Sequence, residues 1–233
     1  MNCIVCTHQS TESFQTSDGK IYWNCQFCFT KFLDPSFYIE SSVEKERYLE
    51  HNNRIDDEAY RAFLSRLATP LKEKLSVGDQ GLDFGCGHGP ALADMLKGYG
   101  FAVDLYDPFF FPDKKIFLNQ YNFITCTETA EHFYHPYQEF NTLDALLKPG
   151  GWLGMMTSFL REDQEFETWY YRRDPTHVTF YAEKTFEVIA AQRNWQYEII
   201  SKDIVLLHKP HESTPSTIAS LCVQGVASKD SVL

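Results

Sequence analysis

The stretch LDFGCGHGP at residues 82–90 constrains the fold more than any other, because an apolar run leads directly into three closely spaced glycines. An apolar strand followed by a glycine-rich turn and a helix presents backbone N–H groups and little side-chain bulk to a ligand. The stretch therefore predicts a strand–turn–helix unit with a ligand site at the end of its strand. A plain tight turn is the alternative.

Two well-known glycine-loop motifs do not match this stretch. A phosphate-binding P-loop needs a Gly-Lys-Ser/Thr triplet, which does not follow here. The dinucleotide motif G-x-G-x-x-G fits Gly85 and Gly87 but needs a third glycine where Pro90 stands. Asp107 ends the next apolar run about 20 residues further on, where a carboxylate can bind both ribose hydroxyls. The pattern therefore remains compatible with an adenosine-containing ligand.

The chain after residue 79 alternates short apolar runs with helical patterns. Strands are predicted near 81–85, 101–106, 122–127, 152–158, 196–201 and 203–208, and helices near 90–98, 136–147 and 183–193. This alternation predicts an α/β sheet with largely parallel strands. The last two strands are joined so closely that we expect an antiparallel hairpin.

Four of the seven cysteines are clustered near the N-terminus, as two Cys-x-x-Cys pairs at positions 3–6 and 25–28. Two such pairs at this spacing can complete the tetrahedral four-thiolate site that zinc prefers. So short a segment needs the metal for stability, and four thiolates leave no open position for catalysis. Unligated thiols or a redox pair are the alternatives, but a redox pair normally begins a helix. The predicted ligands of a structural zinc are Cys3, Cys6, Cys25 and Cys28.

We expect four parts in the chain: a zinc-ribbon-like knot at 1–33, a helical cap or linker at 34–78, the α/β domain at 79–209 and a tail at 210–233. No stretch approaches the roughly 20 apolar residues that span a bilayer, and the N-terminus lacks the features of a secretory signal. We therefore expect a cytoplasmic protein without membrane contact. The formal net charge of −11 argues against nucleic acid as a partner.

The chain resembles the class I S-adenosylmethionine (SAM)-dependent methyltransferases, and in particular methyltransferase-23-like domains. The resemblance is carried by LDFGCGHGP, VDLYDP, FITCTETAEHFYHP, LKPGGWLGMMT and DPTHVTFYAEKTFEVIA, which occur in the family's order over roughly residues 44–208. It implies a Rossmann-like sheet and SAM as the methyl donor. The SAM-binding residues that it implies are Asp83, Gly85, Gly87 and Gly89 at the methionine end, Asp107 at the ribose, and Thr127 and Glu128 at the floor.

The chain departs from the family pattern in one region. Asp107 and Asn122 are separated only by the stretch PFFFPDKKIFLNQY, which is too short for the usual helix, strand and connections. We therefore expect a shortened or missing third strand, which removes the usual source of adenine contacts. Phe109, Phe110 or Phe111 either stack on the adenine or pack against the shortened edge of the sheet.

Three histidines are candidates for the base that removes a proton from the methyl acceptor. His177 is the first candidate, with Asp174 near enough to orient it, and His132 after the fourth strand is the second. His51 lies in the preceding helical segment, which in this fold often covers SAM. Each could instead be an ordinary hydrogen-bonding residue. The stretch WYYRRDP at 169–175 stands where a substrate cap would, with Arg172 or Arg173 for an anionic group.

The resemblance predicts an enzyme that transfers a methyl group from SAM to a small molecule, with O-methylation as the first choice. The first alternative is an RNA methyltransferase that grips RNA with the zinc knot, although Lys20 and Lys31 are the only basic residues in that segment. The second alternative is a catalytically silent SAM-binding partner protein. The sequence does not name the acceptor.

Overall fold

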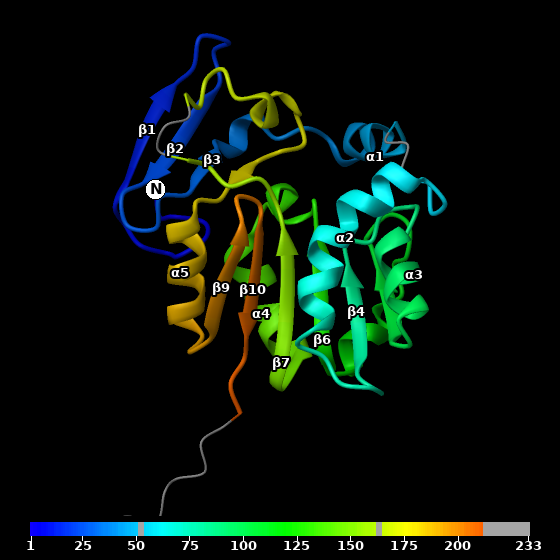
Figure 1. Cartoon of the computed structure of the whole chain (residues 1–233). Coiled ribbons are helices and arrows are strands. Elements are labelled where there is room, and N and C mark those ends of the chain that lie inside the picture. The colour runs from blue at the N-terminus through cyan, green and yellow to red at the C-terminus, as the bar shows by residue number, and fades with distance from the viewer. Residues whose placement is uncertain (51–53, 162–164, 212–233) are drawn as a thin grey trace, which may run out of the picture.

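The computed structural model describes residues 1–50, 54–161 and 165–211. Its larger sheet has six strands in the order β5-β4-β6-β7-β10-β9 (Figure 1). Neighbours β5, β4, β6 and β7 are parallel, while β10 runs antiparallel to both β7 and β9. The strands are β4 (Gln80–Phe84), β5 (Ala102–Tyr106), β6 (Tyr121–Thr127), β7 (Leu147–Met156), β9 (Gln196–Ser201) and β10 (Ile204–His208). The predicted Rossmann-like α/β sheet and its terminal hairpin are confirmed.

Helices cover both faces of this sheet (Figure 1). Helices α2 (Glu58–Lys72) and α3 (Ala91–Gly98) pack on one face, against residues such as Phe123 and Met156. Helices α4 (Pro136–Leu146) and α5 (Glu183–Gln192) pack on the other, against residues such as Ile124 and Met155. Consecutive strand residues therefore enter opposite cores, as the two-residue period of a strand requires.

The third strand of the family's sheet is absent from the described residues, as the short spacing between Asp107 and Asn122 predicts. Strand β5 is the edge of the sheet among the described residues, and the connection to β6 contains only the short 3₁₀ helix η2 (Lys114–Leu118). Tyr121 at the start of β6 closes this edge, since its hydroxyl donates to the Asp104 carboxylate at 2.9 Å. Phe117 of the connection packs edge to face on Tyr106 of β5, with 5.0 Å between the ring centroids.

Residues 1–33 contribute most of a second, smaller sheet above one end of the larger one (Figure 1). Its order is β1-β2-β3-β8, with β1 (Thr11–Gln15), β2 (Ile21–Cys25) and β3 (Lys31–Leu33). The fourth strand, β8 (Thr179–Phe180), comes from the far end of the chain and pairs antiparallel with β3. The four-cysteine segment, residues 1–33, is therefore joined to the α/β domain by a shared sheet.

The described residues of the predicted helical cap or linker at 34–78 contain two α-helices, α1 (Ser41–Leu49) and α2. Asp57 is the N-cap of helix α2, and its carboxylate accepts a hydrogen bond from the backbone N–H of Tyr60 at 2.8 Å. The residue His51 lies outside the described residues, and so does most of the predicted tail. Among the described helices, none has the length and apolar character to cross a bilayer.

Candidate active site

A cavity of about 1070 Å³ lies beyond the C-terminal ends of β4, β5 and β6, beneath α1. Parallel α/β sheets bind their ligands at this edge. The cavity is lined by the glycine loop, by the start of the β5–β6 connection, by residues that follow β6 and by part of the 170–177 loop. Of the predicted site residues, those that line it are Gly85, Gly87, Asp107, Thr127, Glu128, His132, Asp174 and His177.

The glycine loop turns sharply at the C-terminal end of β4. Gly85 has a φ of +80° and Gly87 a φ of +62°, a left-handed region that side chains rarely adopt. A Cβ atom at Gly85 would overlap the Thr129 side chain. Thr129 in turn donates a hydrogen bond from Oγ1 to the Gly85 carbonyl at 3.1 Å. Only glycine fits between β4 and the residues that follow β6.

Asp107 joins this loop to the connection after β5. One carboxylate oxygen accepts from the Gly87 N–H at 3.1 Å, and the other accepts from the N–H groups of Phe109 and Phe110 at 2.8 and 3.0 Å. Phe109 and Phe110 line the cavity, whereas Phe111 pairs with Asp107 through the backbone. The carboxylate predicted to bind ribose therefore stands between the loop and two aromatic side chains of the cavity wall.

Asp83 and Gly89 do not line the cavity. Asp83 is buried beneath the loop, where its carboxylate accepts a hydrogen bond from Thr125 Oγ1 at 2.7 Å. Burial raises the pKa of Asp83 to about 6, because removal from water disfavours the charged form. Asp83 supports the loop from below instead of forming part of the cavity wall.

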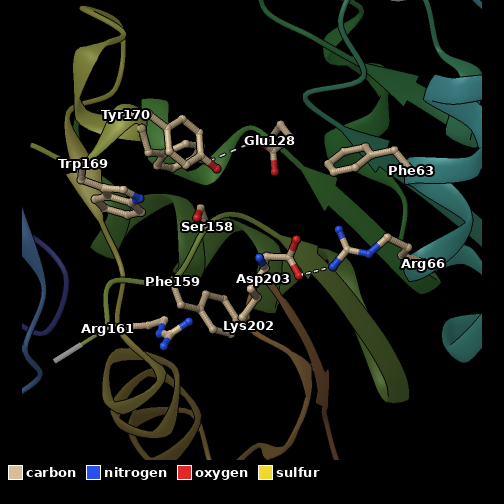
Figure 2. A pocket seen from close by; sticks show the side chains of 11 residues that line it. Phe63, Arg66, Glu128, Ser158, Phe159, Arg161, Trp169, Tyr170, Lys202 and Asp203 are labelled. Carbon is tan, nitrogen blue, oxygen red and sulfur yellow. Dashed lines mark hydrogen bonds and ion pairs between the residues drawn. The ribbon is translucent and has the colours of Figure 1, made fainter. Parts of the chain in front are cut away.

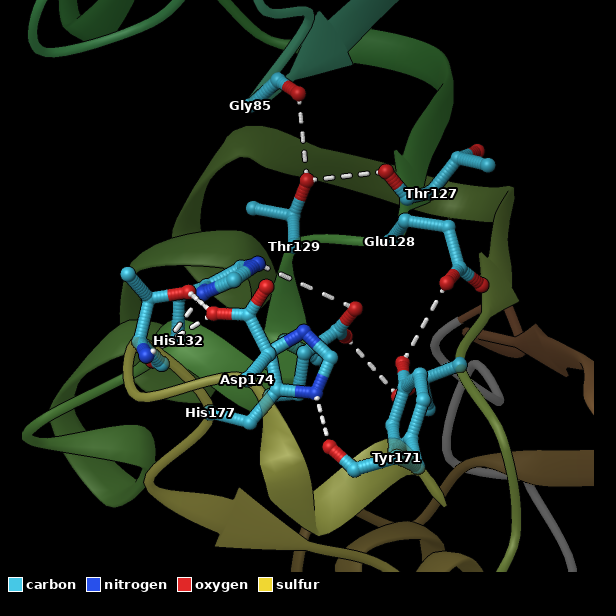
Figure 3. A network of polar contacts seen from close by, with 12 residues as sticks. Gly85, Thr127, Glu128, Thr129, His132, Tyr171, Asp174 and His177 are labelled. Atoms are coloured by element: carbon cyan, nitrogen blue, oxygen red, sulfur yellow. Dashed lines mark hydrogen bonds and ion pairs between the residues drawn. The ribbon is translucent and has the colours of Figure 1, made fainter. Parts of the chain in front are cut away.

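Glu128 occupies an unusual position directly after β6 (Figure 3). It has a φ of +47°, a strained conformation for a residue with a side chain. Its carboxylate accepts a hydrogen bond from the Tyr171 hydroxyl at 3.3 Å, and partial loss of water on the cavity wall raises its pKa above the usual range. The neighbouring Thr127 Oγ1 is buried and has no hydrogen-bond partner among the described residues. Both polar groups are candidates to contact SAM, as the sequence predicts.

Glu131, His132 and His177 form a compact cluster on the cavity wall. Figure 3 shows the two histidines of this cluster. One ligand atom from each of these side chains lies within 4.8 Å of those of the other two. Glu131 is fully buried, and its Oε2 accepts a hydrogen bond from Thr157 Oγ1 at 2.8 Å. The two imidazole rings meet edge to face at 4.8 Å between centroids. The sequence places His132 and His177 far apart, and the fold brings them together.

Asp174 does not hold the His177 ring, contrary to the sequence interpretation. The Nδ1 atom of His177 lies 2.7 Å from the Tyr171 carbonyl, which orients the ring. The Asp174 carboxylate accepts instead from Thr176 N–H and Oγ1, at 3.0 and 2.6 Å, and pairs with Arg47 of α1 at 3.1 Å. Asp174 therefore fixes the loop and anchors α1 across the cavity. Burial lowers the pKa of His177 to about 4, so the ring is neutral at neutral pH.

A smaller cavity of about 480 Å³ adjoins the first and shares Glu128, Tyr170 and Tyr171 with it (Figure 2). Its remaining wall combines aromatic side chains with charged ones, including the ion pair of Arg66 with Asp203. Part of the predicted substrate cap does line a cavity, because Trp169 and Tyr170 belong to this wall.

Arg172 is not available to bind an anionic substrate. Its guanidinium donates to the Asp18 carboxylate at 3.0 Å and to the Tyr22 hydroxyl at 3.2 Å, both in the four-cysteine segment. It also donates to the Glu167 carbonyl at 3.0 Å. The prediction that Arg172 contacts an anionic acceptor is corrected: this residue ties the substrate-cap loop to the hairpin of β1 and β2. Arg173 does line the larger cavity.

The four predicted zinc ligands come together and are all buried. Sγ of Cys3 lies 3.7 Å from that of Cys28, and Sγ of Cys6 lies 3.7 Å from that of Cys25. Four sulfurs at the usual Zn–S distance of about 2.3 Å from one ion lie about 3.8 Å apart. The spacing and the donor set therefore fit a tetrahedral zinc ion.

Sequence reasoning missed two contributors to the candidate site, Glu131 as a member of the histidine cluster and Tyr171 as its hydrogen-bonding partner. The acidic residue beside His132 in ETAEH was the available signal for Glu131. No pattern indicates that the Tyr171 carbonyl holds His177, because that contact depends on how the 170–177 loop folds.

Comparison with protein families matches residues 49–199 to the family described as a methyltransferase domain. Among solved structures, an O-methyltransferase family protein from Burkholderia thailandensis shares 15% identity, covers 72% of this chain and 63% of its own, and has a TM-score of 0.46. The N-methyltransferase NodS from Bradyrhizobium japonicum, bound to S-adenosyl-L-homocysteine (SAH), shares 14% identity over 72% of this chain and 98% of its own, with a TM-score of 0.47. No curated protein matches the chain.

Proposed function

The chain belongs to the methyltransferase domain family, and from this premise we propose that it transfers a methyl group from SAM to a hydroxyl of a small-molecule acceptor. One observation carries the proposal: a single cavity joins the glycine loop and Asp107 to the cluster of Glu131, His132 and His177. A donor-binding loop and a cluster with proton-accepting atoms thus face the same space.

SAM would lie across the ends of β4 and β5. The glycine loop allows a ligand to approach its backbone closely, and Asp107 offers a carboxylate to the ribose. Phe109 and Phe110 offer aromatic faces to the adenine in place of the missing third strand. Thr127 Oγ1, buried and without a partner among the described residues, would complete the set.

Methyl transfer is an in-line displacement in which the acceptor oxygen attacks the methyl carbon while the sulfur leaves as SAH. Alignment of the two substrates supplies much of the acceleration, and the acceptor proton must be removed. His177 is our first candidate for the residue on which proton removal depends, and His132 is the second. Both lie on the wall of the same cavity.

The smaller cavity supports a small molecule as the acceptor. Its volume of about 480 Å³ lies in the range of small-ligand pockets, and it meets the donor cavity at Glu128. The RNA alternative has no such support. Basic residues are few in the four-cysteine segment, and one of them, Lys31, donates a hydrogen bond to the Asn24 side chain at 3.2 Å. We also propose that the four thiolates hold a structural zinc and that the protein works in the cytoplasm.

The test measures donor binding and turnover separately. Calorimetry with SAH should show binding to the purified protein, and labelled SAM should label the small-molecule fraction of a metabolite and RNA mixture. If SAH does not bind, the proposal is wrong; if only RNA is labelled, the acceptor class is wrong.

A substitution tests the role of His177. We expect His177→Asn to lower turnover by about 10²–10⁴-fold, the usual contribution of proton transfer, and to change the Kd for SAH less than about twofold. The matched control is His208→Asn, because His208 stacks on Trp152, away from the cavity, and should leave turnover unchanged. Unchanged turnover in His177→Asn would remove His177 from the mechanism.

A further inference from the structure

We propose that Glu131, His132 and His177 bind a divalent transition-metal cation, with a coordination position open to the donor cavity. The proposal concerns a second metal site, apart from the four cysteines, and only its consequence for catalysis rests on the proposed function. It starts from geometry, since the candidate ligand atoms of the three side chains lie within 4.8 Å of one another on the cavity wall.

Both imidazoles are oriented in the way that metal-binding histidines usually are. The Nδ1 atom of His132 lies 3.0 Å from the Thr176 carbonyl, and Nδ1 of His177 lies 2.7 Å from the Tyr171 carbonyl. A carbonyl oxygen only accepts hydrogen bonds, so Nδ1 must carry the proton in each ring and Nε2 must carry the lone pair. Backbone carbonyls commonly orient zinc-binding histidines in this manner.

The carboxylate of Glu131 supplies an independent observation. The residue is fully buried, and its Oε1 has no hydrogen-bond partner among the described residues. This oxygen lies 3.9 Å from Nε2 of His132, too far for a hydrogen bond. A buried carboxylate oxygen without a hydrogen bond is costly in the protein interior, and a cation between these side chains would satisfy it. Thr157 holds the other oxygen of Glu131 in place.

The donor set indicates the class of ion. Two imidazole nitrogens and one carboxylate oxygen suit zinc and other first-row transition metals, whereas magnesium prefers oxygen ligands alone. Ligand atoms that share one such ion lie about 3.3 Å apart, so the cluster must contract by up to about 1.5 Å when it binds. Three protein ligands leave a fourth position, which this site would direct into the cavity.

This site would change how the acceptor is activated. With the cation bound, the two imidazoles are ligands and not bases, and the cation lowers the pKa of an acceptor hydroxyl by direct coordination. The proton then goes to water, the oxygen attacks the methyl carbon, and SAH leaves. His177→Asn is inactive under either role, so the metal must be measured directly.

The experiment titrates Co²⁺ into the full-length protein and follows the absorption spectrum, because thiolate and imidazole sites differ in it. A four-thiolate site gives intense sulfur-to-cobalt charge-transfer bands, which a site of two histidines and a glutamate lacks. We expect one equivalent with these bands unless zinc already fills the four-cysteine site, and in either case a second equivalent without them. Glu131→Gln and His177→Asn should weaken the second equivalent by about tenfold or more and leave the first unchanged, while His208→Asn should retain both.

Each outcome decides between the proposals. A titration that lacks the equivalent without charge-transfer bands, or one in which that equivalent survives in both Glu131→Gln and His177→Asn, overturns the metal site. Calorimetry with SAH on the same samples shows that the variants are folded. Normal SAH binding without the second equivalent would refute this inference alone, whereas failure to bind SAH would refute the proposed function whatever the metal does.

Discussion

Two carboxylates at the ends of sheet strands have raised pKa values, and of these Asp83 is buried whereas Glu128 is exposed on the cavity wall. Asp83 in β4 accepts a hydrogen bond from Thr125, and Glu128 follows β6 with a positive φ. Burial raises the pKa of Asp83, and partial loss of water around the carboxylate on the cavity wall raises that of Glu128. Carboxylates with raised pKa values and residues with strained backbone conformations lower the stability of the folded protein. Both are common at functional sites, where they contribute to ligand binding or catalysis.

Replacing Asp83 by Asn should change the dependence of stability on pH. Its pKa is about 6 in the folded protein, above the ordinary 3.8, so the folded state binds the proton more tightly than the unfolded state. The contribution of this side chain to stability is therefore fully present below about pH 4 and falls as the pH rises to 6, by about 3 kcal/mol in all.

Urea unfolding at pH 4 and pH 7 measures this effect. We expect the unfolding free energy of Asp83→Asn, relative to the natural protein, to increase between the two pH values. The matched control is Asp113→Asn, at an exposed cap of η2, measured in the same way. An Asp83→Asn difference that is equal at both pH values would contradict the prediction.

The β4–α3 junction depends on close contact between the glycine loop and the residues after β6. Thr129 Oγ1 bonds to the Gly85 carbonyl, and there is no room for a Cβ atom between them. Because the same loop lines the cavity, the geometry of the donor site is set by contact between two elements and not by the loop alone.

We expect Gly85→Ala to weaken SAH binding by at least about tenfold, or about 1.4 kcal/mol. The added methyl group would overlap Thr129, and the left-handed conformation would be strained. The control Gly98→Ala, at the end of α3, meets no atom within 4 Å and should bind SAH normally. Calorimetry checks both variants, and equal affinities would show that the loop does not form the donor site.

At the scale of the whole molecule, the four-cysteine segment supports the 170–177 loop of the candidate site. Backbone N–H of Leu33 donates to the carbonyl of Val178, the residue after His177, at 2.8 Å. Arg172 ties the same loop to Asp18, and Thr185 Oγ1 at the start of α5 donates to the Cys28 carbonyl at 2.8 Å. The segment and the site therefore share one framework.

Loss of the proposed structural zinc should reach the active site through this framework. We expect Cys25→Ser to lose the zinc, to lower the melting temperature by more than about 5 °C and to reduce methyl transfer more than SAH affinity. Elemental analysis, thermal unfolding and turnover measure these effects. Glu12→Gln on β1, which keeps all four thiols, is the control. A zinc content near zero in the unmodified protein would contradict the metal assignment.

Much of the fold could be predicted because it depends on local patterns. Apolar residues repeat every two residues in the strands of the larger sheet and every three to four in the helices that cover it, and these repeats predicted the positions of both. The short spacing between Asp107 and Asn122 predicted that the third strand is missing. The Cys-x-x-Cys spacing predicted that the four sulfurs meet. The contacts of Asp174 and Arg172 could not be predicted in this way, because their partners lie 127 and 154 residues away.

The sequence by itself determined the strand–loop–helix unit, the position of the donor loop and the cysteine cluster, since each depends on neighbours a few residues apart. Only the tertiary structure decided that β8 completes the cysteine-bearing sheet and that His177 meets His132 and Glu131. The physical reason is that contacts between distant segments are set by the packing of complete elements. Local sequence patterns do not predict which surfaces of distant helices, strands and loops will be in contact.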